Sequence, residues 1–259
     1  MKEIKILAIG DIVGRVGRNI VGNKLQGLVD RHRIDVVVAN GENSAGGMGM
    51  TPDKTRELFS YGVNVITSGN HVWNKNEILE ILDSEPAFIR PANYPPGVPG
   101  KGYYILNVRG VSICIVNLIG RVLMNTLDCP FRKFDEIYNE VKDKCKVIVV
   151  DFHAEATSEK QALGWYVDGR ASAIFGTHTH VQTADERILH KGTGYITDIG
   201  MTGPFDSVIG MKKEKSIDHF LYQTKMKFEP ATDNPGINGV IFTINPGTGK
   251  TENITRVRE

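Results

Sequence analysis

The sequence predicts an α/β fold in which two mixed β-sheets pack against each other and helices cover the outside. Three features of the 259-residue chain lead to this prediction. Short apolar runs recur along the chain, helix signals separate the early runs, and two hairpin patterns occur outside that alternation. Short apolar runs bounded by turn-forming residues are typical of strands buried on both faces.

The predicted central strands are six apolar runs, each bounded by Gly, Asn or Asp. They cover residues 4–9, 36–39, 63–67, 113–118, 147–152 and 171–175.

Helix signals fill the longer segments between the early runs. Thr51 and Pro52 suit the cap and first residue of a helix that continues over 54–60. The string Asn74-Lys75-Asn76-Glu77 resembles a capping box that opens a helix to about residue 82. Further helices are predicted over residues 17–31, 131–144, 159–165 and 213–225. Strand–helix alternation in the first half predicts βαβ units with right-handed crossovers.

Two further pairs of apolar segments predict hairpins. Residues 103–108 and 111–118 flank Arg109-Gly110, and residues 238–244 and 251–257 flank the turn 246–249. Parallel and antiparallel pairing must therefore be mixed. We expect the proline-rich segment 85–102 to be an ordered surface loop. We also expect residues 1–259 to form one domain, since single α/β domains of about 200–250 residues are ordinary.

Composition restricts the classes of partner. With 41% hydrophobic residues, 24% charged residues and a net charge of +1, the chain can bury a core but has no field that attracts a polyanion, so we expect no extended nucleic-acid surface.

The N-terminal apolar run is too short for a signal peptide, and no run approaches the ~18 residues that span a bilayer. The cysteines Cys114, Cys129 and Cys145 are odd in number and lack C-x-x-C spacing, which argues against a disulfide framework and favours the reducing cytoplasm. Together with the lack of a long apolar run, this predicts a cytoplasmic protein without a membrane partner.

Polar side chains follow five of the predicted strands at their carboxyl ends. These segments are Gly10-Asp11, Gly41-Glu42-Asn43, Gly69-Asn70-His71, His153, and Gly176-Thr177-His178-Thr179-His180. In α/β sheets the strand ends face one crevice, so these residues are expected to meet in space although they are far apart in sequence.

Each of these residues has an ordinary explanation when taken singly. Asp11 could cap the following helix, Glu42-Asn43 could belong to a polar turn, and His71 could be a surface histidine. Jointly, so many polar groups in one crevice would carry a desolvation cost of several kcal/mol, which a pair of metal ions would offset. Imidazole, carboxylate and amide ligands without thiolate suit iron, manganese or zinc, and argue against a zinc finger or an oxygen-only calcium site.

The strand-end set resembles the ordered signature of the calcineurin-like metallophosphoesterases. The longer strings Gly10-Asp11-Ile12-Val13-Gly14, Asn40-Gly41-Glu42-Asn43, Gly69-Asn70-His71-Val72-Trp73 and Asp128-Cys129-Pro130-Phe131 resemble the narrower bacterial YmdB family. This resemblance implies a four-layer αββα sandwich. It also implies phosphodiesterase activity on 2′,3′-cyclic nucleotides.

The resemblance further implies a site with two metal ions, expected to be iron or manganese. Asp11, Glu42, Asn43 and His180 would hold the first, Glu42, Asn70, His153 and His178 would hold the second, and Glu42 would bridge them. A hydroxide shared by the ions would attack phosphorus in line, and His71 would protonate the leaving ribose oxygen, giving a 3′-phosphate. Arg121, after another strand end, is a candidate phosphate contact, against the alternative of a solvated loop arginine.

The chain departs from the broad superfamily at three positions. Val13 stands where the broad pattern has a metal-binding histidine, and Asn43 is its natural replacement. Glu42 replaces the usual bridging Asp. Val72 replaces the acidic residue that often follows G-N-H, so no carboxylate is in place to fix the tautomer of His71.

Other functions remain open at this point. A dinucleotide-binding fold would use Gly10, Gly14 and Gly17, but their spacing is not G-x-G-x-x-G and Asp11 would repel a pyrophosphate. In a metal-dependent amidohydrolase, H-x-H ends the first strand of a barrel, whereas here it comes late. A regulatory protein that binds a cyclic nucleotide or RNA end and turns it over slowly would have the same residues. Specificity is expected to come from loops such as 85–102 and 120–131, and self-association is plausible.

Overall fold

The computed structural model describes residues 2–259, and its strands form two large sheets. The first sheet has the order β14 (Thr251–Arg258), β13 (Asn238–Ile244), β1 (Ile4–Ile9), β3 (Val36–Asn40) and β4 (Val65–Thr67). Strands β1, β3 and β4 are parallel, whereas β13 is antiparallel to both of its neighbours. The predicted mixture of pairing is confirmed.

The second sheet has a parallel centre and antiparallel edges. Its order is β5 (Tyr103–Val108), β6 (Val111–Ile119), β7 (Val147–His153), β8 (Ala173–Thr177), β10 (Gly194–Ile196) and β9 (Arg187–Ile188). Strands β6, β7, β8 and β10 are parallel, and the predicted hairpin of β5 and β6 forms one edge.

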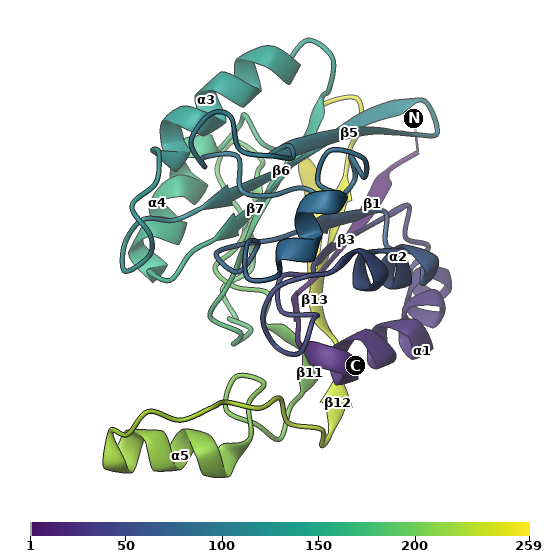
Figure 1. The fold of residues 1–259 in the computed structure, drawn as a ribbon. Helices are drawn as coiled ribbons and strands as arrows, with labels where there is room; N and C mark the ends of the chain where they lie inside the picture. The colour runs from purple at the N-terminus through teal and green to yellow at the C-terminus, as the bar shows by residue number, and fades with distance from the viewer. Residues whose placement is uncertain (1) are drawn as a thin grey trace.

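The two sheets pack face to face, and helices cover their outer faces (Figure 1). Apolar residues of both sheets share the central core, where the rings of Phe175 and Phe242 stack at 6.3 Å. Helices α1 (Gly14–His32) and α2 (Pro52–Ser60) lie on the first sheet, and α3 (Pro130–Val141) and α4 (Thr157–Val167) on the second. The predicted four-layer αββα sandwich is therefore confirmed.

Ile115 of β6 is fully buried in the core between the sheets. We expect Ile115→Val to lower the free energy of unfolding by about 1 kcal/mol, because it removes one methylene from a close-packed interior. Urea-induced unfolding measures this change. The control Ile217→Val lies at a side chain that is 53% exposed, and should change stability by less than about 0.5 kcal/mol. Equal losses in the two variants would contradict this account of the core.

A third, small sheet carries a projecting arm. It has the order β12 (Pro235–Gly236), β11 (Met201–Pro204) and β2 (Asp11–Ile12). We call residues 205–234, between β11 and β12, the arm. It contains α5 (Lys213–Tyr222), which lies apart from the two-sheet body at the bottom of Figure 1. Backbone hydrogen bonds from Lys212 to Glu229 and from Ala231 to Gly210, both 2.9 Å, join the two sides of its stem.

The structure corrects two sequence-based predictions. The segment 74–82 forms only a short 3₁₀ helix, η1 (Asn76–Glu80), with Lys75 at its N-cap and no side-chain cap. The backbone N–H of Asn74 instead donates to the carbonyl of His71, so the turn that follows the site continues through the expected capping box. The segment 85–102 is not a surface loop throughout. Phe88 is buried and forms an isolated parallel bridge with Ile66 of β4.

Within residues 2–259, no helix has both the length and the apolar character needed to cross a bilayer.

Candidate metal centre

The strand ends meet at one edge of the sandwich, as the parallel topology requires. Asp11 opens β2 directly after β1, Glu42 and Asn43 follow β3, Asn70 and His71 follow β4, His153 ends β7, and His178 and His180 follow β8. All these residues belong to one hydrogen-bonded cluster. Asp11, Glu42 and His153 within it are completely or almost completely buried.

One group of contacts surrounds the imidazole of His153. Its Nε2 atom lies 2.8 Å from Asn70 Oδ1, 3.1 Å from Glu42 Oε1 and 3.1 Å from His178 Nδ1. Neighbouring ligands on a cation with bonds of about 2.1 Å are themselves separated by about 3 Å. This group therefore has the spacing and donor types of a metal-binding set, and it contains the four residues that the sequence assigned to the second ion.

A second group of contacts surrounds the imidazole of His180. Its Nε2 atom lies 3.2 Å from Asn43 Nδ2 and 3.7 Å from Asp11 Oδ1. Asn43 Nδ2 lies 3.3 Å from Glu42 Oε1, so Glu42 touches both groups. These are the residues that the sequence assigned to the first ion, with Glu42 in the shared position.

Asp11 provides the test of whether a cation fits. Its Oδ2 accepts the backbone N–H of His178 at 3.1 Å, but its buried Oδ1 has no hydrogen-bond partner among residues 2–259. Leaving a buried carboxylate oxygen without a partner costs about 1–3 kcal/mol or more. A cation beside Asp11 and His180 would be a partner for this oxygen and would remove that cost. The donor set therefore fits a metal.

Two imidazole rings are oriented from behind by hydrogen bonds. The hydroxyl of Thr177 donates to Asp151 Oδ1 at 2.7 Å, so its oxygen accepts the Nδ1 proton of His153 at 3.0 Å. The Nδ1 proton of His180 is donated to the carbonyl of Ile209 at 2.8 Å. Both rings consequently point Nε2 into the site, which is the arrangement expected of metal-binding histidines.

The buried charges shift one another's proton affinities. Burial alone would lower the pKa of His153, but the carboxylates of Glu42, Asp11 and Asp151 outweigh it and raise that pKa to about 9. Burial would raise the pKa of Glu42, but His153 and His71 lower it to about 2. Burial and the charge of His153 lower the pKa of His178 to about 3. Positive charge in the cluster is thus drawn toward the carboxylate of Glu42.

The backbone around the site is shaped for close approach. His178 and His180 have φ angles of 96° and 64°, values that are uncommon for residues other than glycine and that concentrate at functional sites. A Cβ atom on Gly69 would lie 2.3 Å from both Glu42 Oε2 and the His153 ring. Gly69 therefore has to be glycine for these two side chains to meet.

His71 has a partner that sequence reasoning missed. Its Nδ1 lies 2.8 Å from Asn43 Oδ1, so an amide takes the place of the missing carboxylate. Asn43 consequently turns its NH₂ group, not its oxygen, toward Glu42 and His180. To bind a cation through oxygen, the amide must rotate by half a turn and give its NH₂ group to His71 Nδ1.

Arg121, the candidate phosphate contact, and Glu155 complete the description of the site. Arg121 is exposed, its guanidinium donates to Cys129 Sγ at 3.5 Å, and none of its hydrogen bonds within residues 2–259 reaches the cluster. Glu155, which the sequence did not single out, places Oε2 3.1 Å from His178 Nε2. Its position two residues after His153, at the same strand end, was the available signal.

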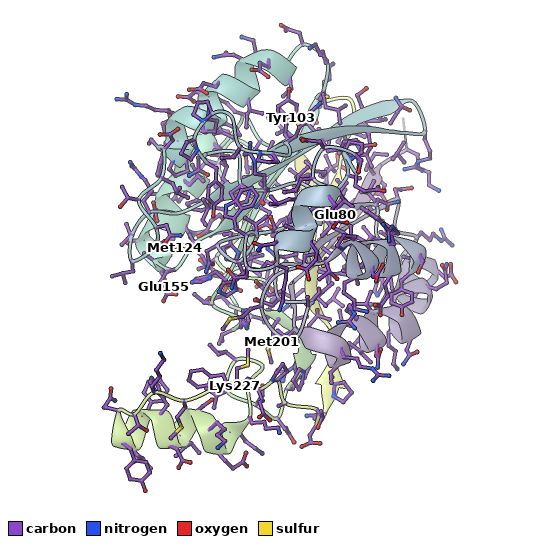
Figure 2. All side chains as sticks on the ribbon, viewed as in Figure 1. Glu80, Tyr103, Met124, Glu155, Met201 and Lys227 are labelled. Atoms are coloured by element: carbon purple, nitrogen blue, oxygen red, sulfur yellow. The ribbon has the colours of Figure 1, made fainter. Side chains whose placement is uncertain are left out.

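Two pockets open onto the cluster, besides a third, of about 650 Å³, that touches it at His180. The first, of about 270 Å³, lies between five residues of the cluster and the arm, and the second, of about 280 Å³, lies between Asn70, His178 and residues 123–125. Figure 2 shows Met124 and Glu155 on the same side of the molecule. Of the two loops expected to set specificity, 120–131 borders the second pocket and 85–102 lines neither, whereas the arm lines the first pocket.

Known proteins match this chain over nearly its whole length. A family model described as YmdB-like protein matches residues 7–257. The 2′,3′-cyclic-nucleotide 2′-phosphodiesterase of Bacillus subtilis (strain 168) is 46% identical over 254 residues, covering 98% of this chain and 96% of the relative.

Solved structures agree with the observed fold. A crystal structure of a hypothetical protein from Thermus thermophilus has a TM-score of 0.93 and 42% identity, and the match covers 99% of each chain. A 5′-nucleotidase precursor from the same organism has a TM-score of 0.57 at 12% identity, covering 99% of this chain and 54% of that one, and is similar in fold alone.

Proposed function

The chain belongs to the YmdB-like protein family, has the calcineurin-like fold and is a phosphoric diester hydrolase, and from this premise we propose that it opens 2′,3′-cyclic nucleotides at the 2′ oxygen, leaving a 3′-phosphate. The main support is the convergence of carboxylate, amide and imidazole groups around a buried Asp11 oxygen that has no partner among residues 2–259. The substrate class follows the name of the Bacillus subtilis relative.

We propose that two cations, iron or manganese, occupy this site. Asp11, Glu42, Asn43 and His180 would hold the first, and Glu42, Asn70, His153 and His178 would hold the second. When bound, such a pair supplies Lewis acidity, which neutralises phosphate charge and lowers the pKa of the water that attacks phosphorus in line.

The chain's own residues handle the proton and the substrate. His71 is 26% exposed and lines the first pocket beside the cluster, so it can reach a bound ester. When the amide of Asn43 turns to offer its oxygen to a cation, its NH₂ group donates to Nδ1 of His71. The ring proton of His71 is then on Nε2, which can donate it to the leaving 2′ oxygen.

The direct test is an assay of purified protein loaded with iron or manganese. The panel contains 2′,3′-cyclic mononucleotides, linear diesters and monoesters, with turnover and affinity measured for each. We expect the cyclic nucleotides to be hydrolysed fastest and to give 3′-monophosphates. A protein inert toward every phosphate ester would contradict the proposal, whereas tight binding with very slow, release-limited hydrolysis would favour the regulatory alternative.

Glu42→Ala tests the proposed shared ligand without measuring activity. Because Glu42 touches both groups of donors, we expect the variant to lose at least one of two bound metal equivalents, measured by elemental analysis. The control Glu140→Ala removes a surface carboxylate that, among residues 2–259, accepts a hydrogen bond from Tyr103, and should keep the wild-type metal content. Full metal content in Glu42→Ala would contradict the assignment.

A further inference from the structure

The arm forms an apolar wall opposite the candidate metal centre. Ile209, Phe220 and Phe228 of the arm line the first pocket together with Met48 from the loop after β3. Their side chains are 53%, 71%, 37% and 43% exposed, respectively. Grouped apolar exposure beside a pocket is typical of a surface that a ligand covers. The arm projects from the body in Figure 2, where Lys227 marks the segment that returns from α5.

The opposite wall of the same pocket is polar. His71, His178 and His180 line it, and the buried carboxylate of Glu42 lies behind them. A pocket of about 270 Å³ is thus lined both by residues of the candidate metal centre and by aromatic residues of the arm. Its ligand should carry an anionic group at one end and a flat apolar group at the other.

The arm is attached to the site by defined contacts. The carbonyl of Ile209, whose side chain lines the pocket, accepts the Nδ1 proton of His180 at 2.8 Å. Within the arm, the ring of His219 packs edge-on to Phe220 and Phe228, with centroids 5.7 and 5.4 Å apart. His219 Nδ1 donates to the carbonyl of Thr224 at 3.1 Å, which fixes its ring beside the two phenylalanines.

We propose that this aromatic wall binds the nucleobase of the substrate, an inference that rests on the proposed function and extends it. A cyclic nucleotide carries phosphate and base on one ribose, so a phosphate at the metal centre brings the base toward the arm. Base stacking on aromatic side chains tolerates every base, because each has a π-face. The arm therefore gives affinity for nucleosides over bare sugar phosphates without selecting one base.

The experiment compares adenosine 2′,3′-cyclic phosphate with ribose 2′,3′-cyclic phosphate, which lacks the base. In the double variant Phe220→Ala/Phe228→Ala, we expect KM for the adenosine substrate to rise by about 10-fold or more, the scale of lost base stacking. KM for the base-free substrate, kcat and metal content should stay unchanged. The matched control is Tyr222→Ala, an aromatic residue on α5 that is 65% exposed and does not line the pocket.

Several outcomes would overturn the inference. These are an unchanged KM for the adenosine substrate, an equal change for both substrates, or a wild-type enzyme that does not distinguish them. Equal changes accompanied by loss of self-association in gel filtration would assign the surface to a second copy of the chain. If neither substrate is hydrolysed, the proposed function fails separately. Calorimetry then tests whether the aromatic wall binds a base, because the double variant should bind adenosine 3′-monophosphate more weakly than the wild type does.

Discussion

Replacing His71 with alanine should lower the turnover of a 2′,3′-cyclic nucleotide by roughly 100-fold or more while the metal content stays at the wild-type level. The imidazole lies at the pocket but outside the two groups of donors around His153 and His180, and its Nδ1 is held by Asn43. Its loss removes a proton donor to the leaving oxygen and leaves the proposed ligands in place. Steady-state kinetics and elemental analysis of the same sample measure both quantities.

The matched control is His190→Ala. His190 is exposed and stacks on Trp165, away from the cluster, so its removal should leave turnover unchanged. A His71→Ala protein with both full turnover and full metal content would show that the leaving oxygen is protonated by another group.

Loss of Lys160 should be among the most destabilising single changes in the chain. Lys160 of α4 is 2% exposed, and its Nζ lies 2.7 Å from Oδ2 of the fully buried Asp198. The same carboxylate accepts the backbone N–H and hydroxyl of Thr179 and, through Oδ1, the N–H of Gly200. Thr179 separates His178 from His180, so this buried ion pair holds the loop that presents both imidazoles.

We expect Lys160→Met to lower the free energy of unfolding by about 3–5 kcal/mol, because it leaves the charge of Asp198 unpaired in the interior. Denaturant-induced unfolding measures the loss. The double variant Lys160→Met/Asp198→Asn should recover part of it, since it removes the unpaired charge and the amide oxygen can still accept the hydrogen bonds from Thr179 or the one from Gly200.

The control for this effect is a more exposed ion pair. Arg256 Nε lies 2.8 Å from Glu186 Oε1, with side chains 38% and 23% exposed. Arg256→Met should therefore cost less than about 1 kcal/mol. A Lys160→Met loss no larger than that of Arg256→Met would show that the buried pair does not stabilise this region.

Local sequence patterns predicted the large elements well. Continuous apolar runs identified β1, β3, β6 and β7 to within two residues at each end, because strands covered on both faces must be apolar throughout. The short strands β2, β9, β10, β11 and β12 were missed. Segments of two to four residues carry no periodicity, and they pair only because the rest of the fold brings them together.

The capping-box prediction at Asn74 failed for a related reason. A local helix signal is worth about 1 kcal/mol, and the turn that positions His71 uses the backbone of the same residues. Tertiary contacts of the site therefore decided the conformation of this segment, and only η1 remains of the expected helix.

The sequence by itself determined the two-sheet fold and the order in which carboxylate, amide and imidazole residues follow the strands, because both depend on the local alternation of apolar runs and polar strand ends. Only the tertiary structure decided which side chains form hydrogen bonds and ion pairs around these residues, and that the arm lines the same pocket. The contacts of Asn43 with His71, of Lys160 with Asp198 and of the arm with His180 join segments from 28 to 38 residues apart. No local pattern encodes such contacts, since they arise where the packing of sheets and helices brings distant segments together.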